Sequence, residues 1–256
     1  MTTTGRVRAE AGAAWRAFLR RRTAVFFTFF FPVILVVIFG ALVGTTPAGG
    51  GLFTEPPAYY LPGYLAVVVL FTPLSRVGSE VARHRGGNRF EKLATTPLSR
   101  AEWLLAQTLV NVAVIGLAAL VIVALVVLVT GATVARSPAL ALVVPFVALA
   151  VALFCGLGAV LGRVADSQDG VVAASNAVAL PLLFLSETFV PPSLLPAWFV
   201  PLMDLSPLTY FSRGVRAVTA PSTVPGAATP TVDLAVLAAL AVALFAAGAV
   251  AIPRTD

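Results

Sequence analysis

Apolar residues fall into six long runs, separated by shorter stretches rich in Arg, Pro and small polar residues. At a rise of about 1.5 Å per residue, each run is long enough as a helix to cross a hydrocarbon core of about 30 Å. Lipid offers the backbone no hydrogen-bond partners, so runs of this kind are predicted to be helical. The predicted spans are residues 24–43, 58–77, 104–130, 139–161, 171–190 and 234–252.

Composition supports a membrane protein. Of the 256 residues, 59% are hydrophobic and only 11% are charged, whereas about a quarter of a typical soluble domain is charged. We therefore predict an all-α membrane protein with one six-span domain, residues 24–256, preceded by an N-terminal segment, residues 1–23. The first run is longer than the apolar region of a signal peptide, so we expect it to be retained as a span.

The positive charges are distributed unevenly about these spans. All Lys and Arg residues except Arg136, Arg213 and Arg216 fall on the side that holds both termini and the loops around residues 78–103 and 162–170. Because cytoplasmic loops are enriched in Lys and Arg, we expect both termini to be cytoplasmic, in the cell membrane. The positive charge forms no basic face separate from the spans, which argues against nucleic-acid binding.

The N-terminal segment has an amphipathic helical pattern. Trp15 and Phe18 lie on one predicted face, whereas Arg16 and Arg20 lie on the opposite face. This pattern favours an interfacial helix on the cytoplasmic leaflet, in contact with membrane lipids. A solvated basic tail is the alternative.

The stretch between the second and third spans predicts a short helix followed by a sharp corner. Asn88 is a suitable N-cap for about two helical turns over residues 89–95. A residue before proline disfavours the helical region, so this helix is expected to stop before Pro97. Ser99 and Glu102 then form the S-x-x-E pattern of a capping box that begins the third span.

Phe90 and Leu93 lie at helical spacing within this short helix. A loop of this length is not expected to cover its own apolar stripe. The cover is therefore predicted to come either from the membrane interface or from a partner protein.

Three segments, in order, resemble permeases of the type-2 ATP-binding-cassette (ABC) exporter family. The sequence "FEKLATTPLSRAEWLLAQ", Phe90–Gln107, resembles their cytoplasmic loop, and "PLLFLSETFVPPSLLPAW", Pro181–Trp198, resembles their broken fifth helix and outer re-entrant turn. The sequence "LSPLTYFSRGVRAV", Leu205–Val218, is similar to a further Pro-Leu-Thr-Tyr segment of the family. One departure is Glu187, because that outer turn often carries Gly after Leu-Ser.

The resemblance implies that residues 88–96 form a coupling helix that docks on a separate ATPase subunit. The implied contact residues are Phe90, Glu91, Leu93, Thr96 and Pro97. It also implies two ATPase subunits carrying ATP and Mg, and a second six-span permease copy or paralogue. The resemblance is closest to the daunorubicin/doxorubicin-resistance type, which implies export of a lipophilic drug or lipid-like metabolite and hence antibiotic resistance. Export of a polysaccharide or lipid-linked glycan, and a stand-alone secondary carrier, are the alternatives.

Catalytic chemistry is not expected on this chain. A P-loop needs a glycine-rich loop with a Lys that reaches the phosphates, and the only lysine is Lys92, which is followed by Leu93, so the sequence has no P-loop for ATP. One His and one Cys cannot supply the three or four ligands of a typical zinc site. Polar residues within or at the ends of spans are candidates for a transport pathway or exit, namely Asn111, Asn176 and Glu187. The two Asn residues alternatively join helices through hydrogen bonds, and Glu187 alternatively pairs with Arg213 or Arg216.

Overall fold

The computed structural model describes residues 2–42, 55–223 and 229–253. Val43, at the end of the first predicted span, and Arg254 lie outside these ranges. The described residues form helices and no strands, as predicted for an all-α protein. The α-helices are α1 (Thr3–Arg20), α2 (Arg22–Val36), α3 (Leu61–Gly86), α4 (Arg89–Ala94), α5 (Arg100–Thr130), α6 (Val143–Val164), α7 (Gln168–Phe184), α8 (Val200–Met203), α9 (Pro207–Thr219) and α10 (Pro230–Ala251).

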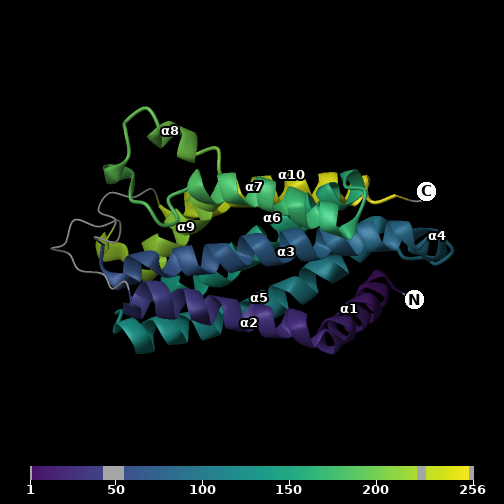
Figure 1. The fold of residues 1–256 in the computed structure, drawn as a ribbon, viewed down its shortest axis with the longest axis horizontal. Coiled ribbons are helices and arrows are strands. Elements are labelled where there is room, and N and C mark those ends of the chain that lie inside the picture. The colour runs from purple at the N-terminus through teal and green to yellow at the C-terminus, as the bar shows by residue number, and fades with distance from the viewer. Residues whose placement is uncertain (1, 43–54, 224–228, 254–256) are drawn as a thin grey trace.

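Five stretches of helix in the described residues are long and apolar enough to cross a membrane. They are Arg22–Gly40, Pro57–Gly86, Arg100–Thr130, Pro138–Val164 and Pro230–Ala251, and they run along the long axis of the molecule (Figure 1). The predicted span at residues 171–190 corresponds to α7, a shorter apolar helix of 17 residues. This helix ends at Phe184, three residues after Pro181, and the chain then turns.

Glycines allow the central helices to approach closely. Helix α6 contacts both α3 and α10, and a Cβ atom added at Gly158 of α6 would lie 2.5 Å from the carbonyl oxygen of Leu74 in α3. A Cβ atom at Gly248 of α10 would likewise lie 2.5 Å from the carbonyl oxygen of Gly156 in α6. Small residues at helix interfaces permit the backbone contact that stabilises helix packing in lipid.

Helix α1 is amphipathic, but its apolar face packs on the protein. Ala14 and Phe18 are buried against Val110 and Val114 of α5, and Trp15 lies partly buried at the edge of this contact. Helix α5 therefore covers Phe18, whose side chain was expected to face lipid, while Trp15 stays partly exposed. Figure 1 shows α1 lying at an angle to the long helices at one end of the bundle.

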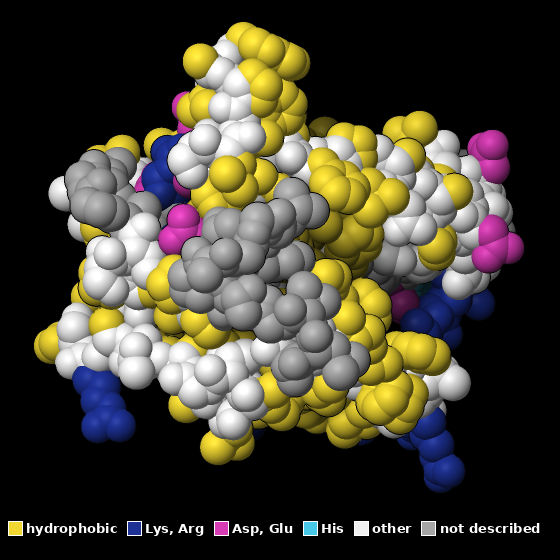
Figure 2. Space-filling model, turned by 60° about the vertical axis from the view of Figure 1, so that its left-hand side comes forward, with side chains coloured by type: hydrophobic (Ala, Val, Ile, Leu, Met, Phe, Trp, Pro, Cys, Tyr) yellow, Lys and Arg dark blue, Asp and Glu magenta, His cyan; other side chains and the backbone are white. Residues whose placement is uncertain are grey.

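The segment between α7 and α9 projects from the opposite end of the bundle, where α8 stands away from the long helices (Figure 1). Its exposed apolar side chains include Trp198 and Leu205, which are 71% and 70% exposed. In the view of Figure 2, which brings this end of the molecule forward, hydrophobic side chains cover much of the surface and Lys and Arg side chains are few. Exposed apolar area of this extent indicates contact with lipid or another protein.

Candidate functional site

The short helix α4 follows a tight turn at the end of α3. Asn88 adopts a left-handed conformation, with φ of 50° and ψ of 32°, which Asn tolerates better than most residues. Asn88 is the N-cap of α4, as predicted, but its side chain makes no capping hydrogen bond. The turn instead uses Asn88 for its backbone conformation, and α4 begins at Arg89.

The corner between α4 and α5 is built as the sequence predicts. The Thr96 hydroxyl donates to the carbonyl oxygen of Leu93 at 2.7 Å, and Pro97 follows. Ser99 then caps α5: its backbone N–H donates to Glu102 Oε2 at 2.7 Å, while the Glu102 N–H donates to Ser99 Oγ at 3.2 Å. This confirms the predicted capping box and fixes where α5 begins.

Phe90 is the anchor of α4 in the bundle. Its side chain is only 4% exposed, and its ring centroid lies 5.3 Å from that of His84 in α3 and 5.4 Å from that of Trp103 in α5. The expectation that Phe90 needs cover from outside the chain is therefore wrong. Two flanking helices supply that cover, because α3 extends to Gly86, well past the predicted end of the second span at Val77.

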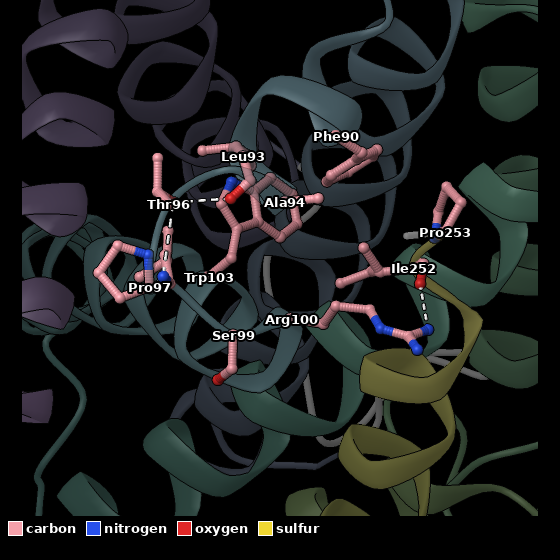
Figure 3. A pocket seen from close by; sticks show the side chains of 11 residues that line it. Phe90, Leu93, Ala94, Thr96, Pro97, Ser99, Arg100, Trp103, Ile252 and Pro253 are labelled. Atoms are coloured by element: carbon pink, nitrogen blue, oxygen red, sulfur yellow. Dashed lines mark hydrogen bonds between the residues drawn. The ribbon is translucent and has the colours of Figure 1, made fainter. Parts of the chain in front are cut away.

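The outer side of α4 and its following turn form an exposed surface, which we call the α4 ridge. It comprises Glu91, Lys92, Thr96 and Pro97, which are exposed, with Leu93 partly buried at its base. A hollow of about 450 Å³ lies on one flank, lined by α4, the following turn, the start of α5 and the two residues after α10 (Figure 3). A second hollow of about 440 Å³ lies between α4 and α1, and Leu93 and Thr96 line both.

Arginine side chains connect the helices around the α4 ridge. Arg6 of α1 pairs with Glu102 of α5 at 2.5 Å. Arg85 of α3 donates to the carbonyl oxygen of Ala165, just after α6, at 2.5 Å. Arg100 of α5 donates to the carbonyl oxygen of Ile252, just after α10, at 2.5 Å. These contacts join α1 to α5, α3 to the end of α6, and α5 to the end of α10 at this end of the bundle.

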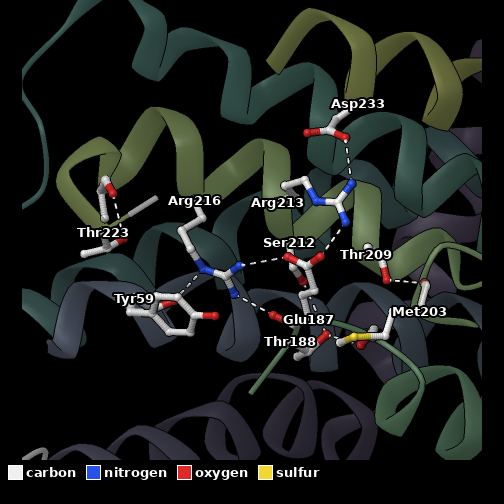
Figure 4. Close-up of polar contacts among 12 residues, drawn as sticks. Tyr59, Glu187, Thr188, Met203, Thr209, Ser212, Arg213, Arg216, Thr223 and Asp233 are labelled. Atoms are coloured by element: carbon white, nitrogen blue, oxygen red, sulfur yellow. Dashed lines mark hydrogen bonds and ion pairs between the residues drawn. The ribbon is translucent and has the colours of Figure 1, made fainter. Parts of the chain in front are cut away.

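A cluster of charged residues lies at the other end, around Glu187 (Figure 4). Arg213 of α9 pairs with Glu187, lies 3.1 Å from the Asp204 carboxylate and lies 4.0 Å from the Asp233 carboxylate. Burial opposes the charge on Arg213, but the hydrogen bond and attraction from Glu187 outweigh it and raise the pKa of the guanidinium above its usual value. Arg216, fully buried, also contacts Glu187. Glu187 is thus a structural ion-pair partner, one of the two alternatives left open by the sequence.

The three polar residues considered for a pathway lie apart. Asn111 is fully buried in α5, where it donates to the carbonyl oxygen of Gln107 at 2.8 Å and accepts from Arg76 at 3.3 Å. Asn176 is exposed on α7 and lines a separate cavity, whereas Glu187 belongs to the cluster just described. The residues expected to contact an ATPase, in contrast, all lie together on α4 and the turn that follows it.

Comparison with known families decides the identity of the chain. The model of the family described as "ABC-2 type transporter" matches residues 7–219. The chain belongs to the ABC-2 type transporter family. No curated protein sequence matches it significantly.

Membership in the ABC-2 type transporter family makes the chain a multi-pass membrane protein and a transmembrane subunit of an ABC transporter, which works with an ABC ATPase. The matched region of this ABC-2 type transporter includes the α4 ridge and all of the cluster around Glu187 except Asp233. Sequence reasoning missed Arg76, which was placed at the end of a span but lies ten residues inside α3. The signal was available in Thr72, Ser75, Arg76 and Ser79, which share one helical face.

Proposed function

We propose that this chain is the permease subunit of an ABC exporter and that a separate ATPase docks on the α4 ridge. The observation that carries the proposal is the form of α4. Its exposed outer surface lies between two hollows, while Phe90 on its inner side is held between α3 and α5. An element exposed to a partner and rigidly attached to long helices suits the transfer of a rigid-body movement.

ATP and Mg would be bound by the partner. The chain carries no P-loop, and its only lysine, Lys92, lies on the α4 ridge. The proposed complex has two ATPase subunits and two permease subunits, the second permease being a copy or a related chain. The chain itself is then not an enzyme, and it needs no cofactor of its own.

The proposed topology has six crossings with both termini in the cytoplasm. Helix α7 would be the fifth span, shorter than the others, extended by the irregular residues 185–190 and followed by an outer re-entrant segment that includes α8. The α4 end carries Arg6, Arg85 and Arg100, among other cations, and cation-rich ends face the cytoplasm. In this arrangement α1 is a cytoplasmic helix that rests on α5, with Trp15 at its edge.

The proposed cargo is a lipophilic drug or lipid-like metabolite, exported across the cell membrane. The resemblance of three segments to permeases of the daunorubicin/doxorubicin-resistance type supports this class of cargo. ATP-driven movement of the ATPase subunits would displace each α4 and tilt the helices attached to it, so that the pathway opens outward. Drug efflux, and therefore antibiotic resistance, is the expected physiological result.

Site-specific cross-linking tests the docking surface directly. Cys155, the only cysteine, is buried, and replacing it with Ala gives a background in which one introduced cysteine reports one position. Glu91→Cys on the α4 ridge, labelled with a maleimide–benzophenone probe in native membranes, is expected to capture an ATPase upon illumination. Mass spectrometry of the captured chain would identify its nucleotide-binding motifs.

Arg136→Cys is the matched control, because Arg136 is exposed in the loop between α5 and α6. It is expected to capture no ATPase. Equal capture from both positions, or capture of no ATPase from Glu91→Cys in membranes that retain the complex, would contradict docking on the α4 ridge.

A further inference from the structure

A cavity of about 460 Å³ lies between α1, α2, α3 and α7, away from the α4 ridge and from the cluster around Glu187. One part of its lining is aromatic and the other is polar. The aromatic residues are Phe18, Phe27, Phe31 and Phe71, and the polar residues are Arg21, Thr28, Thr72, Ser75, Arg76, Ser79 and Asn176. The lining contains two cationic side chains and no acidic ones.

Arg76 is the unusual member of this lining. It lies ten residues, or about 15 Å of helix, before the end of α3 at Gly86, so it is on the long helix itself and not in the loop that follows. Its guanidinium lies 4.6 Å from the centroid of the Phe18 ring and donates to Asn111 Oδ1 at 3.3 Å. These two groups are neutral, so they position the cation without forming an ion pair with it; the carboxylate of Glu80 acts on Arg76 only at longer range.

Within the described part of the chain, no carboxylate oxygen lies within 4.0 Å of the Arg76 guanidinium. Glu80, one turn further along α3, already pairs with Arg83 and lies 3.6 Å from Arg21. A cation packed between apolar helices is costly unless it is paired, and in membrane proteins such residues usually mark substrate pathways. The charge that would complete the pairing is an anion.

The cavity also provides an apolar wall beside the cation. Phe27 and Phe31 of α2 are 63% and 47% exposed, so this side of the cavity opens at the surface of the bundle, where lipid would lie. Arg21 and Phe31 are ten residues apart, so the lining extends along about 15 Å of helix. An anionic group at Arg76 therefore leaves room for an apolar tail along the aromatic residues.

We propose that this cavity binds an amphiphile with an anionic head group, and that Arg76 determines this specificity. The head group, a phosphate or a carboxylate, accepts hydrogen bonds from Arg76 and from the hydroxyl groups of Thr72 and Ser75. The tail lies against Phe27 and Phe31. The amphiphile would be the substrate class of the proposed permease. Only its transport across the membrane rests on the proposed function. Binding itself requires no ATPase.

Fluorescence binding to the full chain in phosphatidylcholine nanodiscs tests the proposal. The probe is dansyl-undecanoate, a fluorescent carboxylate, and the competitors are dodecyl phosphate, dodecanoate and dodecyltrimethylammonium. Both anionic competitors are expected to displace the probe, and the one with the lower inhibition constant identifies the preferred head group. The cationic competitor is expected to be at least about tenfold weaker, given the strength of charge-assisted hydrogen bonds.

Variants separate specificity from structural support. Arg76→Gln is expected to weaken probe binding about tenfold or more, and Arg76→Lys, which keeps the charge, is expected to recover much of that loss. Arg163→Gln is the control, since Arg163 is exposed and does not line the cavity. Asn176→Trp tests the location independently: it fills the cavity from an exposed position on α7 and is expected to reduce binding without altering the contacts of Arg76.

Three results would overturn the proposal. They are competition by the cationic amphiphile equal to that by the anionic ones, probe binding by Arg76→Gln equal to wild type, and unchanged binding by Asn176→Trp. Wild-type binding by Arg76→Gln is also the result expected if a second copy of the chain supplies the missing carboxylate. If binding behaves as expected but Glu91→Cys captures no ATPase, the anion site stands and the export proposal fails.

Discussion

The Arg216 guanidinium contacts both the backbone carbonyl oxygen and the side-chain carboxylate of Glu187. The Arg216 Nη2 atom donates to the Glu187 carbonyl oxygen at 2.6 Å, and Nη1 lies 3.8 Å from the Glu187 carboxylate. The guanidinium carbon also lies 3.9 Å from the centroid of the Tyr59 ring, and Nε donates to the Tyr59 carbonyl oxygen at 3.2 Å. One fully buried cation thus joins α9, the chain after α7 and the residues before α3.

Removing the charge of Glu187 is expected to be strongly destabilising. Glu187→Gln leaves Arg216 without a counter-charge in a buried site, which costs about 3 kcal/mol or more. Asp204→Asn is the control: its side chain is 51% exposed, so loss of its pairing with Arg213 is expected to cost at most about 1 kcal/mol. The measurement is the free energy of unfolding in mixed micelles titrated with dodecyl sulfate. Equal losses in the two variants would contradict a structural role for the Glu187 pair.

Lysine is not expected to replace Arg216. A lysine ammonium group cannot donate to both carbonyl oxygens as the guanidinium does and also lie over the Tyr59 ring. Arg216→Lys is therefore expected to lower the free energy of unfolding by about 2 kcal/mol. Arg213→Lys is expected to cost less, because Arg213 is partly exposed and can be replaced as a point charge beside Glu187 and Asp204. The midpoint of thermal unfolding in detergent ranks the two. A larger fall in this midpoint for Arg213→Lys than for Arg216→Lys would contradict the prediction that Arg216 is the harder residue to replace.

Close packing of α6 on α3 predicts a third result. Gly158→Ala places a Cβ atom 2.5 Å from the backbone carbonyl oxygen of Leu74, so the helices must separate, at a cost of about 1–3 kcal/mol. Gly116→Ala is the matched control in α5, because an added Cβ atom there meets nothing within 4 Å. That substitution is expected to be neutral or to stabilise by up to about 1 kcal/mol, since Ala is the better helix former. Unfolding in dodecyl sulfate distinguishes the two; similar effects would show that α3 and α6 are not in close contact.

Much of the fold was predictable because it depends on local rules. Hydrophobic runs located the long helices, Pro97 limited α4, and Ser99 with Glu102 marked the start of α5. Each of these features involves residues near one another in the chain. Interactions between distant segments were not predictable in the same way.

The site shows where local reasoning failed. Phe90 was expected to need outside cover because its own loop is short, but its neighbours His84 and Trp103 belong to the two flanking helices. Arg76 was counted with the charges at the end of a span, because Val77 looked like the last apolar residue. Helix α3 continues to Gly86, and Glu80 within that extension pairs with Arg21 and Arg83. These ion pairs compensate the charged residues in the last turns of α3. The hydrophobic pattern alone placed the end of the span before those residues.

The anchoring of α4 predicts a signal that can be followed at one tryptophan. In a background of Trp15→Phe and Trp198→Phe, Trp103 is the only remaining tryptophan and reports on the contact with Phe90. Phe90→Ala removes one of three rings in mutual contact, Phe90, His84 and Trp103, and its cost is expected to be on the order of 3 kcal/mol. Because Trp103 is only 2% exposed with the contact in place, its emission is expected to shift to longer wavelength in this variant.

Lys92→Ala is the control for this measurement, because Lys92 is exposed on the same short helix. It is expected to leave the Trp103 emission unchanged while preserving α4. Phe90→Leu is expected to give an intermediate shift, since Leu fills part of the space. Unchanged emission in Phe90→Ala would mean that α4 is held by its turns alone. The α4 ridge would then lack the rigid attachment through which a docked ATPase is proposed to move α3 and α5.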